Sequence, residues 1–242
     1  MQRLLNAVIS LLYPQRCLGC QVFVQADEQF CQGCAQFVRP ITSPLCLRCG
    51  IPFPTQSGPD HECGGCLKTP PLFRRARAWA HYQYGEAPLQ PVSEAIQQFK
   101  YHRNVSAGKL LAQLAATHFP FVEAQYDVII PVPLHLARLR WRGFNQSLLL
   151  ARSIGRTHQM RVDPFLLERS RPTVPQTQLK VSERRENVKG AFTVTIPERL
   201  QERQVLLVDD VYTSGATVAE CTKALMRAGA QAVDVFTLAR AV

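Results

Sequence analysis

The sequence predicts an α/β protein in which a mostly parallel sheet with helices on both faces follows a small metal-binding domain. Through residues 72–242, short apolar runs alternate with amphipathic stretches, a pattern typical of parallel strands joined by helices. Before residue 72, eight cysteines stand in four pairs of one spacing. We therefore expect two domains, residues 1–71 and residues 72–242, divided at the proline-containing junction LKTPPLFRRARA.

The composition is that of a folded, basic protein. Of its 242 residues, 46% are hydrophobic and 19% are charged, which argues against an intrinsically disordered chain. The formal net charge of +10 favours a polyanionic ligand, either nucleic acid or a phosphorylated metabolite. Composition alone does not choose between the two.

The N-terminal stretch MQRLLNAVISLLYPQRC has apolar residues at helical spacing. Asn6 and Ser10 interrupt it and no small-residue cleavage site follows, so we expect a short helix packed on the protein rather than a signal peptide. Membrane contact by this helix is the alternative. The chain has no run of 18 apolar residues, so we expect no stable membrane insertion and a cytoplasmic location.

The cysteine pairs predict two structural zinc ions. Each pair is separated by two residues, and ten and thirteen residues separate the pairs within each half, which suits one short ribbon per tetrahedral site. A disulfide framework is the alternative, but it requires an oxidising compartment. A closed four-sulfur site leaves no open position for catalysis. The expected ligands are Cys17, Cys20, Cys31, Cys34, Cys46, Cys49, Cys63 and Cys66.

Two further residues could be mistaken for ligands. His61 lies close to Cys63, but with four cysteines available we interpret it as a solvated loop residue. Cys221 falls in a predicted helix and is expected to be part of the core.

The second domain divides into strands and helices by its hydrophobic periodicity. We expect strands at 76–84, 126–133, 204–210 and 232–240, and helices at 88–101, 104–118, 138–159 and 215–229. Residues 170–190 are mostly polar without periodicity, which indicates a loop.

Two adjacent carboxylates, Asp209 and Asp210, follow the apolar run Val205–Val208, and ligands bind at the carboxyl ends of parallel strands. Thr213, Ser214, Gly215 and Thr217 then lead into a helix whose N-terminal N–H groups favour an anion. A carboxylate pair repels phosphate but accepts hydrogen bonds from a vicinal diol. A phosphorylated ribose carries both groups.

Two other classes of protein in which a strand ends in acidic residues fit this sequence less well. A nucleotide hydrolase needs a glycine-rich lysine loop, and in the one candidate Leu110 follows Gly108 and Lys109 where Ser or Thr is required. A phosphate-accepting receiver domain would carry its acidic pair early in the chain.

The stretch VLLVDDVYTSGATV resembles the signature of type I phosphoribosyltransferases, which bind 5-phosphoribosyl diphosphate. More of the chain is similar to the ComF family of competence-associated proteins. The resemblance includes the cysteine pairs, FKYHRN, PVPLHLARLRWRGFNQS, PQTQL, ERRENVKGAF and the signature, and together these run from residue 14 to the C-terminus. It implies a type I phosphoribosyltransferase-like sheet after a double zinc ribbon.

The resemblance also implies roles for particular residues. Asp209 and Asp210 would bind the ribose hydroxyls, and Thr213, Ser214, Gly215, Ala216 and Thr217 the 5-phosphate. The loop Pro131, Val132 and Pro133 would meet the diphosphate, with Arg138, Arg140 and Arg142 nearby. Residues 170–190 would form a flap carrying Gln176, Arg184, Arg185 and Asn187. The alternatives are a solvated helix start for the three arginines and an ordinary surface excursion for 170–190.

Two classes of function follow. In the first, the chain is an enzyme that binds 5-phosphoribosyl diphosphate with Mg²⁺ and transfers phosphoribose to an acceptor. Purine salvage members carry an aspartate where Thr213 stands, so the resemblance does not extend to a purine acceptor. In the second, the chain is a single-stranded DNA-binding adaptor of the DNA-uptake machinery that re-uses the site for ligand sensing. FRRARAWAHYQY has the aromatic and basic mixture of a single-strand contact, although an alternating strand explains it equally well.

Overall fold

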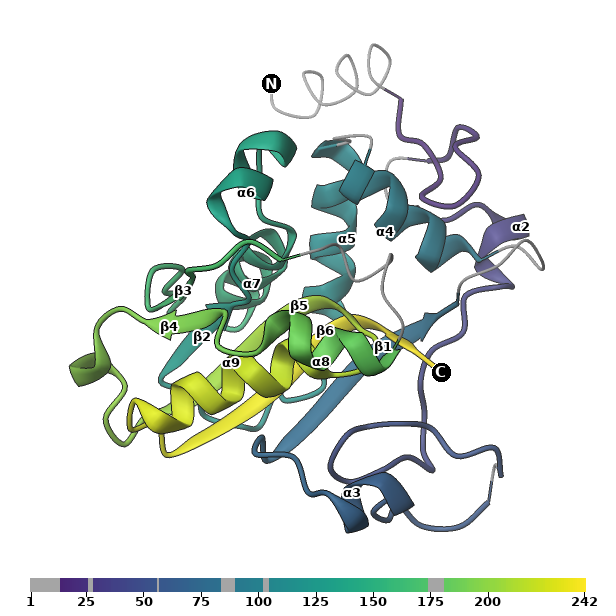
Figure 1. Ribbon diagram of the computed structural model, residues 1–242. Coiled ribbons are helices and arrows are strands. Elements are labelled where there is room, and N and C mark those ends of the chain that lie inside the picture. The colour runs from purple at the N-terminus through teal and green to yellow at the C-terminus, as the bar shows by residue number, and fades with distance from the viewer. Residues whose placement is uncertain (1–13, 26–27, 56, 84–89, 102–104, 174–180) are drawn as a thin grey trace.

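A computed structural model describes residues 14–25, 28–55, 57–83, 90–101, 105–173 and 181–242. At its centre is a four-stranded parallel sheet with the order β1-β6-β5-β2. The strands are β1 (Arg75–Tyr82), β2 (Val128–Pro131), β5 (Gln204–Tyr212) and β6 (Ala232–Ala241). Figure 1 shows them running side by side through the middle of the molecule.

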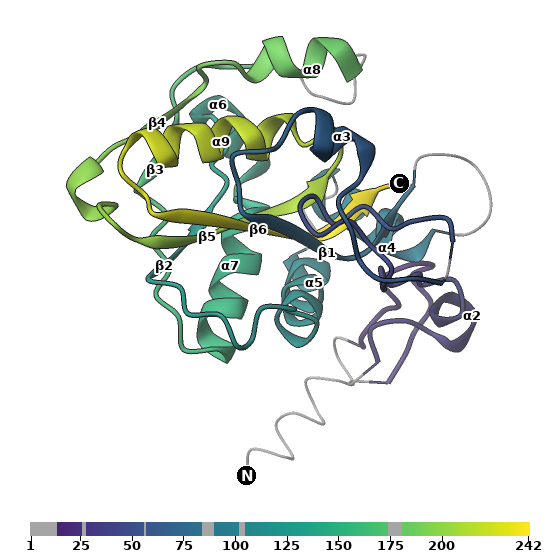
Figure 2. The same cartoon turned by 90° about the horizontal axis from the view of Figure 1, so that it is seen from below.

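Helices cover both faces of this sheet, as Figure 2 shows edge-on. On one face lie α5 (Val105–Thr117) and α7 (Gln146–Thr157), with α4 (Pro91–Tyr101) beside α5. On the other lies α9 (Ala216–Arg227), covered in part by α8 (Val181–Val188). The predicted mostly parallel sheet with helices on both faces is therefore confirmed.

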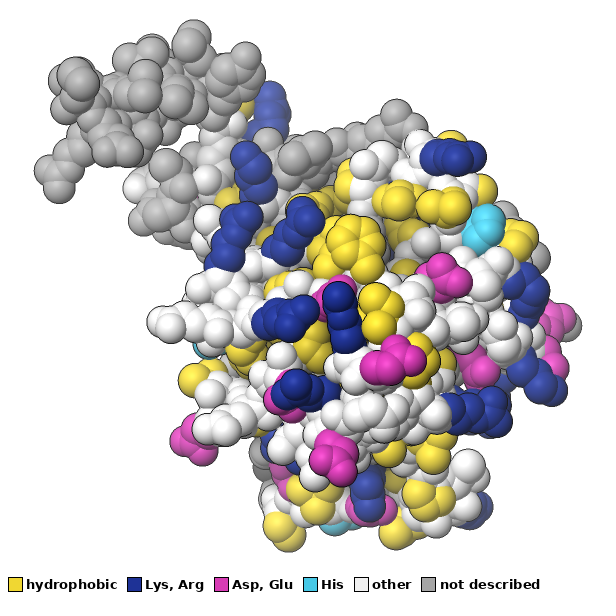
Figure 3. All heavy atoms as spheres, turned by 90° about the vertical axis from the view of Figure 1, so that its left-hand side faces the viewer, with side chains coloured by type: hydrophobic (Ala, Val, Ile, Leu, Met, Phe, Trp, Pro, Cys, Tyr) yellow, Lys and Arg dark blue, Asp and Glu magenta, His cyan; other side chains and the backbone are white. Residues whose placement is uncertain are grey.

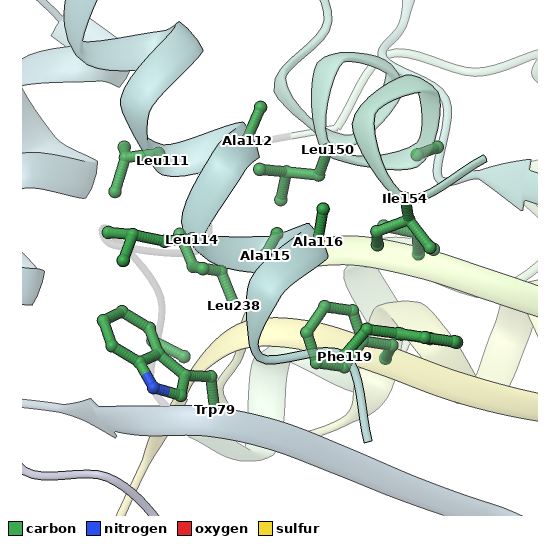
Figure 4. Close-up of a cluster of buried hydrophobic side chains, with 14 of the residues drawn as sticks. Trp79, Leu111, Ala112, Leu114, Ala115, Ala116, Phe119, Leu150, Ile154 and Leu238 are labelled. Atoms are coloured by element: carbon green, nitrogen blue, oxygen red, sulfur yellow. The ribbon is translucent and has the colours of Figure 1, made fainter. Parts of the chain in front are cut away.

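Alternation along the strands explains the two layers. On β5, Leu206 and Val208 belong to the apolar cluster shared with α5 and α7, whereas Val205 and Leu207 belong to the cluster shared with α9. All four are fully buried, as expected of a central parallel strand. Figure 4 shows the first cluster, in which side chains of α5 and α7 point toward Trp79 of β1 and Leu238 of β6.

One predicted helix is two helices. Instead of a single helix over 138–159, the chain forms α6 (Leu136–Arg142) and α7, separated by three residues. Gly143 ends α6 in the left-handed conformation with φ +85°, which cannot continue a helix. Asn145 is extended and donates from Nδ2 to the Val132 carbonyl at 3.0 Å, which holds the break against the end of β2.

The prediction of a loop over 170–190 is wrong in part. A two-stranded antiparallel ribbon, β3 (Leu167–Arg169) and β4 (Phe192–Val194), closes the base of this segment, and Val181–Val188 forms α8. Val188 is buried under α9, and Glu220 of α9 accepts a hydrogen bond from the Gly190 N–H at 2.9 Å. A helix docked through so few apolar residues leaves little periodic signal in the sequence.

The cysteine region contains two separate four-cysteine units with one short helix each, α2 (Gln32–Ala35) and α3 (Gly64–Lys68). The second unit shares an apolar cluster with the sheet, because Cys46, Cys49 and Cys66 are buried with residues of β5, β6 and α9. The first unit contributes Leu18 to the cluster under α4 and α5. The domain boundary near residue 72 stays a prediction, since this packing runs across it.

The helix predicted near the N-terminus lies outside the described residues. No helix within the described part of the chain is both long and apolar enough to cross a membrane.

Candidate functional site

A cavity of about 500 Å³ opens at the carboxyl ends of β2 and β5. The two strands are neighbours, but α7, which follows β2 and α6, and α9, which follows β5, pack on opposite faces of the sheet. Such a point is where parallel sheets form a ligand crevice, because the two connections diverge. The lining comes from the ends of both strands, α6, the start of α7, the end of α4 and the base of the 170–190 segment.

Asp209 and Asp210 both line this cavity. Ser147 of α7 donates to Asp209 Oδ1 at 2.9 Å, and so does the Asp210 N–H, also at 2.9 Å. Lys100 of α4 forms an ion pair with Asp210, with 2.9 Å between Nζ and Oδ1. Burial and the neighbouring Asp210 charge raise the pKa of Asp209 to about 7, despite the opposing effect of the Ser147 hydrogen bond.

The turn after the carboxylates places Thr213, Gly215 and Thr217 along the cavity. Gly215 precedes α9 with φ +75°, a conformation that costs glycine little. A Cβ at this position would overlap the Tyr212 hydroxyl and lie 2.6 Å from Tyr212 Cζ. Glycine is therefore required both by the backbone and by the Tyr212 ring, which itself lines the cavity.

The other two residues predicted for the 5-phosphate do not line the cavity with side chains. The Ser214 hydroxyl accepts from the Ala216 N–H at 3.5 Å, and Ala216 is buried as the first residue of α9. Their expected contribution is limited to backbone N–H groups and stays a prediction.

The predicted diphosphate residues are brought together only in part. Val132, Pro133, Arg138 and Arg142 line the cavity, whereas Pro131 is buried in β2 and Arg140 is exposed outside the lining. Arg138 and Arg142 share one face of α6 because they are four residues apart. Arg142 is 7% exposed and donates to Gln146 Oε1 at 2.8 Å.

The predicted flap residues lie elsewhere. Arg184, Arg185 and Asn187 are on α8 and do not line the cavity, and Gln176 lies outside the described residues. Instead, Arg169, Pro172 and Thr173 form the part of this segment that borders the cavity.

Sequence reasoning missed several lining residues, among them Lys100, Ser147, Arg169, Tyr212 and Trp141. Burial, together with the nearby Arg138 charge, lowers the pKa of Arg169, and its Nε is a buried donor without a hydrogen-bond partner among the described residues. Gln146 Nε2 is a second such donor in the same lining. Buried donors of this kind are suited to hydrogen-bond a polar or anionic group that enters the cavity. The only sequence signal for Lys100 was its place in FKYHRN.

The two cysteine clusters have the geometry of metal sites. In each, the four Sγ atoms lie within 4.8 Å of one another, and the pairs combine as consecutive halves of the region. Cys20 Sγ and Cys31 Sγ are 3.6 Å apart, and Cys49 Sγ and Cys63 Sγ are 3.8 Å apart. These separations exceed a disulfide bond of about 2 Å. They match the edge of a tetrahedron with zinc–sulfur bonds of about 2.3 Å.

Electrostatics within the clusters also fit a cation. Burial opposes ionisation of Cys46, but backbone N–H groups, among them those of Cys63 and Cys49, outweigh it and lower its pKa to about 6. In the same cluster, burial and the neighbouring sulfurs raise the pKa of Cys66. In the first cluster, burial likewise opposes ionisation of Cys17, but backbone N–H groups outweigh it and lower its pKa to about 7. Burial and the neighbouring sulfurs raise the pKa of Cys34. A central zinc ion removes the penalty of crowding four thiolates together, so the donor set fits two structural zinc ions.

The two doubtful ligands belong to neither cluster. His61 stacks on Phe53 with ring centroids 4.0 Å apart. Cys221 is fully buried in α9 within the apolar cluster, so its predicted core role is confirmed.

The aromatic residues of FRRARAWAHYQY that the structure describes, Phe73, Trp79 and Tyr82, are all buried. Arg74 and Arg75 are paired with the buried Asp234 at 2.8 and 2.9 Å. The alternating-strand interpretation therefore explains the described residues of this stretch, among which no aromatic ring is exposed for stacking on bases.

Comparison with known proteins identifies relatives along almost the whole chain. The double zinc ribbon domain family matches residues 8–67. DNA utilization protein YhgH of Escherichia coli O6:H1 is 36% identical over 236 residues, which cover 95% of this chain and 99% of that protein. Competence protein F of Haemophilus influenzae is 30% identical over 93% of this chain and 97% of that protein.

Solved structures with a similar sheet are more distant. A purine phosphoribosyltransferase from Pyrococcus horikoshii is 15% identical with a TM-score of 0.35, covering 55% of this chain and 82% of its own. The glutamine phosphoribosylpyrophosphate amidotransferase of B. subtilis is 20% identical with a TM-score of 0.36, covering 54% of this chain and 25% of its own. These scores are too low to carry an argument about the present site.

Proposed function

This chain belongs to the family of DNA utilization protein YhgH and competence protein F, and on that premise we propose that its cavity binds 5-phosphoribosyl diphosphate with Mg²⁺. The observation that carries the proposal is the meeting of Asp209 and Asp210 with the turn before α9 in one cavity. The carboxylates suit a ribose diol, and the N-terminus of α9 suits the 5-phosphate.

Positive charge around the cavity supports the diphosphate end of this ligand. Arg138, Arg142 and Arg169 approach from α6 and β3, and Lys100 approaches from α4. Arginine is suited to phosphate because its planar fork can donate two parallel hydrogen bonds. The buried donors Arg169 Nε and Gln146 Nε2 would then acquire acceptors.

The proposed reaction is transfer of phosphoribose to an acceptor nucleophile, with diphosphate leaving from the anomeric carbon. Mg²⁺ bound with the ligand would supply positive charge to neutralise the leaving group. The chain's own residues position the ribose and stabilise developing negative charge on the diphosphate. Thr213 lines the cavity where purine salvage enzymes carry an aspartate, so a purine acceptor is not part of the proposal.

Calorimetric titration with 5-phosphoribosyl diphosphate and Mg²⁺ tests the proposal. Asp209→Asn and Asp210→Asn keep size but remove the charged acceptors, so each should weaken binding by about 10- to 100-fold, the effect of losing a charge-assisted hydrogen bond. Asp127→Asn is the matched control, because Asp127 is exposed, forms an ion pair with Arg203 and does not line the cavity. Wild type binding no better than the Asp209 and Asp210 variants would contradict the proposal.

A second candidate, single-stranded DNA binding, is favoured by α6. Trp141 is 56% exposed at the cavity, and Arg138 and Arg140 are on the same short helix. Figure 3 shows Lys and Arg side chains around hydrophobic ones on the upper part of the face that carries α6. Exposed aromatic rings with basic neighbours are the usual contact for unpaired bases and backbone.

Fluorescence anisotropy with labelled single-stranded DNA separates this candidate from the first. Binding should fall steeply as salt rises, and Arg140→Ala should weaken it while leaving 5-phosphoribosyl diphosphate binding unchanged, because Arg140 is outside the cavity. If DNA affinity does not change with salt concentration, or if neither Arg140→Ala nor Trp141→Ala lowers it, α6 is excluded as a DNA contact.

A further inference from the structure

Arg240, near the end of β6, is a buried cation at the second cysteine cluster. It is 6% exposed, its Nη1 donates to the Cys49 carbonyl at 2.7 Å, and its Nη2 is 3.8 Å from Cys49 Sγ. Within the described part of the chain, no carboxylate forms an ion pair with it, and its Nε has no hydrogen-bond partner. A buried guanidinium without a counter-charge is strongly disfavoured.

The second cysteine cluster supplies the missing counter-charge when it holds zinc. Four thiolates around one Zn²⁺ ion leave net negative charge on the site. The cluster fits this ion, since Cys49 Sγ and Cys63 Sγ are 3.8 Å apart and all four sulfurs are within 4.8 Å. Arg240 therefore has the position of an outer-shell partner that both donates to a ligand residue and balances the charge of the site.

On its other side, Arg240 contacts Tyr212, a residue that lines the cavity. Its guanidinium carbon lies 4.2 Å from the centroid of the Tyr212 ring, and the two residues are register partners on β5 and β6. Tyr212 is 9% exposed and lines the cavity, and its ring occupies the space beside Gly215 at the start of α9. A continuous chain of contacts thus joins Cys49, Arg240, Tyr212 and the turn at Gly215.

We propose that Arg240 is a positioning residue that couples zinc occupancy of the second cysteine cluster to ligand affinity of the cavity. Zinc holds Arg240 in place, and Arg240 holds the Tyr212 ring that shapes the turn before α9. The ligand half of this inference rests on the proposed function, whereas the contact with the zinc site does not.

For the first cluster, the described residues show no such connection. Its contacts with α4 are made by neutral groups, where Gln98 Oε1 accepts from Gln21 at 2.5 Å and Gln98 Nε2 donates to the Gly19 carbonyl at 3.5 Å. Among the described contacts of this cluster, no arginine or lysine joins one of its sulfurs to a cavity residue. In Figure 2 the chain of the second cysteine unit lies along β1 and the C-terminal end of β6, and the chain of the first unit lies beyond α4.

Arg77 offers a matched control on the neighbouring strand β1. Like Arg240, it donates to carbonyl groups of the second unit, to Leu47 at 3.1 Å and to Cys46 at 3.5 Å. Unlike Arg240, it lies on β1, which β6 separates from the strand that carries Tyr212. Neither arginine lines the cavity itself. Loss of the Arg77 side chain should weaken the contact between the second cysteine unit and β1. It should leave intact the contacts that join Cys49 through Arg240 and Tyr212 to the turn at Gly215.

Zinc release to a chromogenic chelator, measured on the full-length zinc-loaded protein, tests the zinc contact. Arg240→Met should release one of the two zinc ions more readily, with affinity lowered about 10- to 100-fold, as for other outer-shell partners. Arg240→Lys should recover part of the retention because it restores the charge, and Arg77→Met should release zinc as wild type does. Equal retention in Arg240→Met and wild type would overturn the contact.

Linkage provides the test of coupling in the unaltered protein. If zinc strengthens binding of 5-phosphoribosyl diphosphate, the ligand must strengthen binding of zinc by the same factor. Saturating ligand with Mg²⁺ should therefore raise the chelator concentration needed to remove one zinc ion at equilibrium and leave the other unchanged, and Tyr212→Leu should abolish this protection. Ligand binding without protection of zinc overturns the coupling. Absence of ligand binding refutes the proposed function instead, and zinc retention against the chelator without ligand still decides the role of Arg240.

Discussion

At the scale of single residues, Asp209 is the group whose chemistry depends most on its surroundings. An isolated aspartate is fully ionised at neutral pH, but burial and the adjacent Asp210 charge raise the pKa of Asp209 to about 7. Lys100, Arg169 and Ser147 partly offset this effect. The folded protein therefore holds a proton on this carboxyl over a pH range in which the unfolded chain has lost it.

This raised pKa predicts a pH dependence of stability. A carboxyl whose pKa is higher in the folded state stabilises the fold below its unfolded pKa, and this contribution is lost as pH rises toward about 7. Asp209→Asn cannot ionise, so its stability relative to wild type should increase between pH 4 and pH 7, by at most about 1.4 kcal/mol per pH unit. Urea unfolding of both proteins across this range measures the difference. A constant difference would show that the Asp209 pKa is not raised.

Gly215 illustrates a requirement that comes from a side chain rather than from a ligand. A Cβ at Gly215 meets the Tyr212 ring, whereas a Cβ at Gly190 meets nothing within 4 Å, although both glycines have positive φ, +75° and +64°. Gly190→Ala should therefore cost about 1 to 2 kcal/mol for its backbone alone. Gly215→Ala should cost more in urea unfolding and should also weaken ligand binding in calorimetry. Equal losses in the two variants would mean that Tyr212 moves aside freely.

At the scale of elements, the sequence predicts those parts whose signal is local. The sequence predicts β5 from the run Val205–Val208, which is apolar on both faces, and β1 from alternation of its side chains. It predicts α9 because a periodic stretch follows a glycine turn. The break between α6 and α7 was readable in principle, since a helix-ending glycine at 143 precedes Asn145, a residue favoured at helix starts. Because the apolar periodicity continues on both sides of the break, the pattern predicts one continuous helix.

Features without local signal could not be predicted. The helix α8 is stabilised mainly by docking on α9, so its own sequence resembles a polar loop. The cavity shows the same limit. Asp209 and Asp210 are recognisable because they are adjacent and follow a strand, but Lys100, Ser147 and Arg169 reach them from α4, α7 and β3. Only the folded chain brings such residues together.

At the scale of the whole molecule, the two cysteine units are attached to the sheet in different ways. The second unit is bound to β1 by backbone hydrogen bonds, such as Ala76 N–H to the Arg48 carbonyl at 2.7 Å, and its sulfurs pack in the apolar cluster beneath α9. A side chain at Gly50 would overlap the Ala76 carbonyl, so the contact is close. The first unit touches the helical layer through Leu18 and the Gln98 hydrogen bonds.

This difference predicts unequal consequences of losing each zinc ion. The wild type should contain two zinc ions per chain by elemental analysis, and Cys17→Ser and Cys46→Ser should each retain one, because each removes a ligand from a different cluster. Cys17→Ser should leave urea unfolding of the sheet close to wild type. Cys46→Ser should lower its midpoint, because Cys46 is fully buried in the cluster that packs against β5 and β6. Trp79, buried on β1, reports this transition by fluorescence. If the two variants unfold alike, the second unit is an appended ribbon like the first, and its packing against the sheet contributes nothing to the stability of the fold.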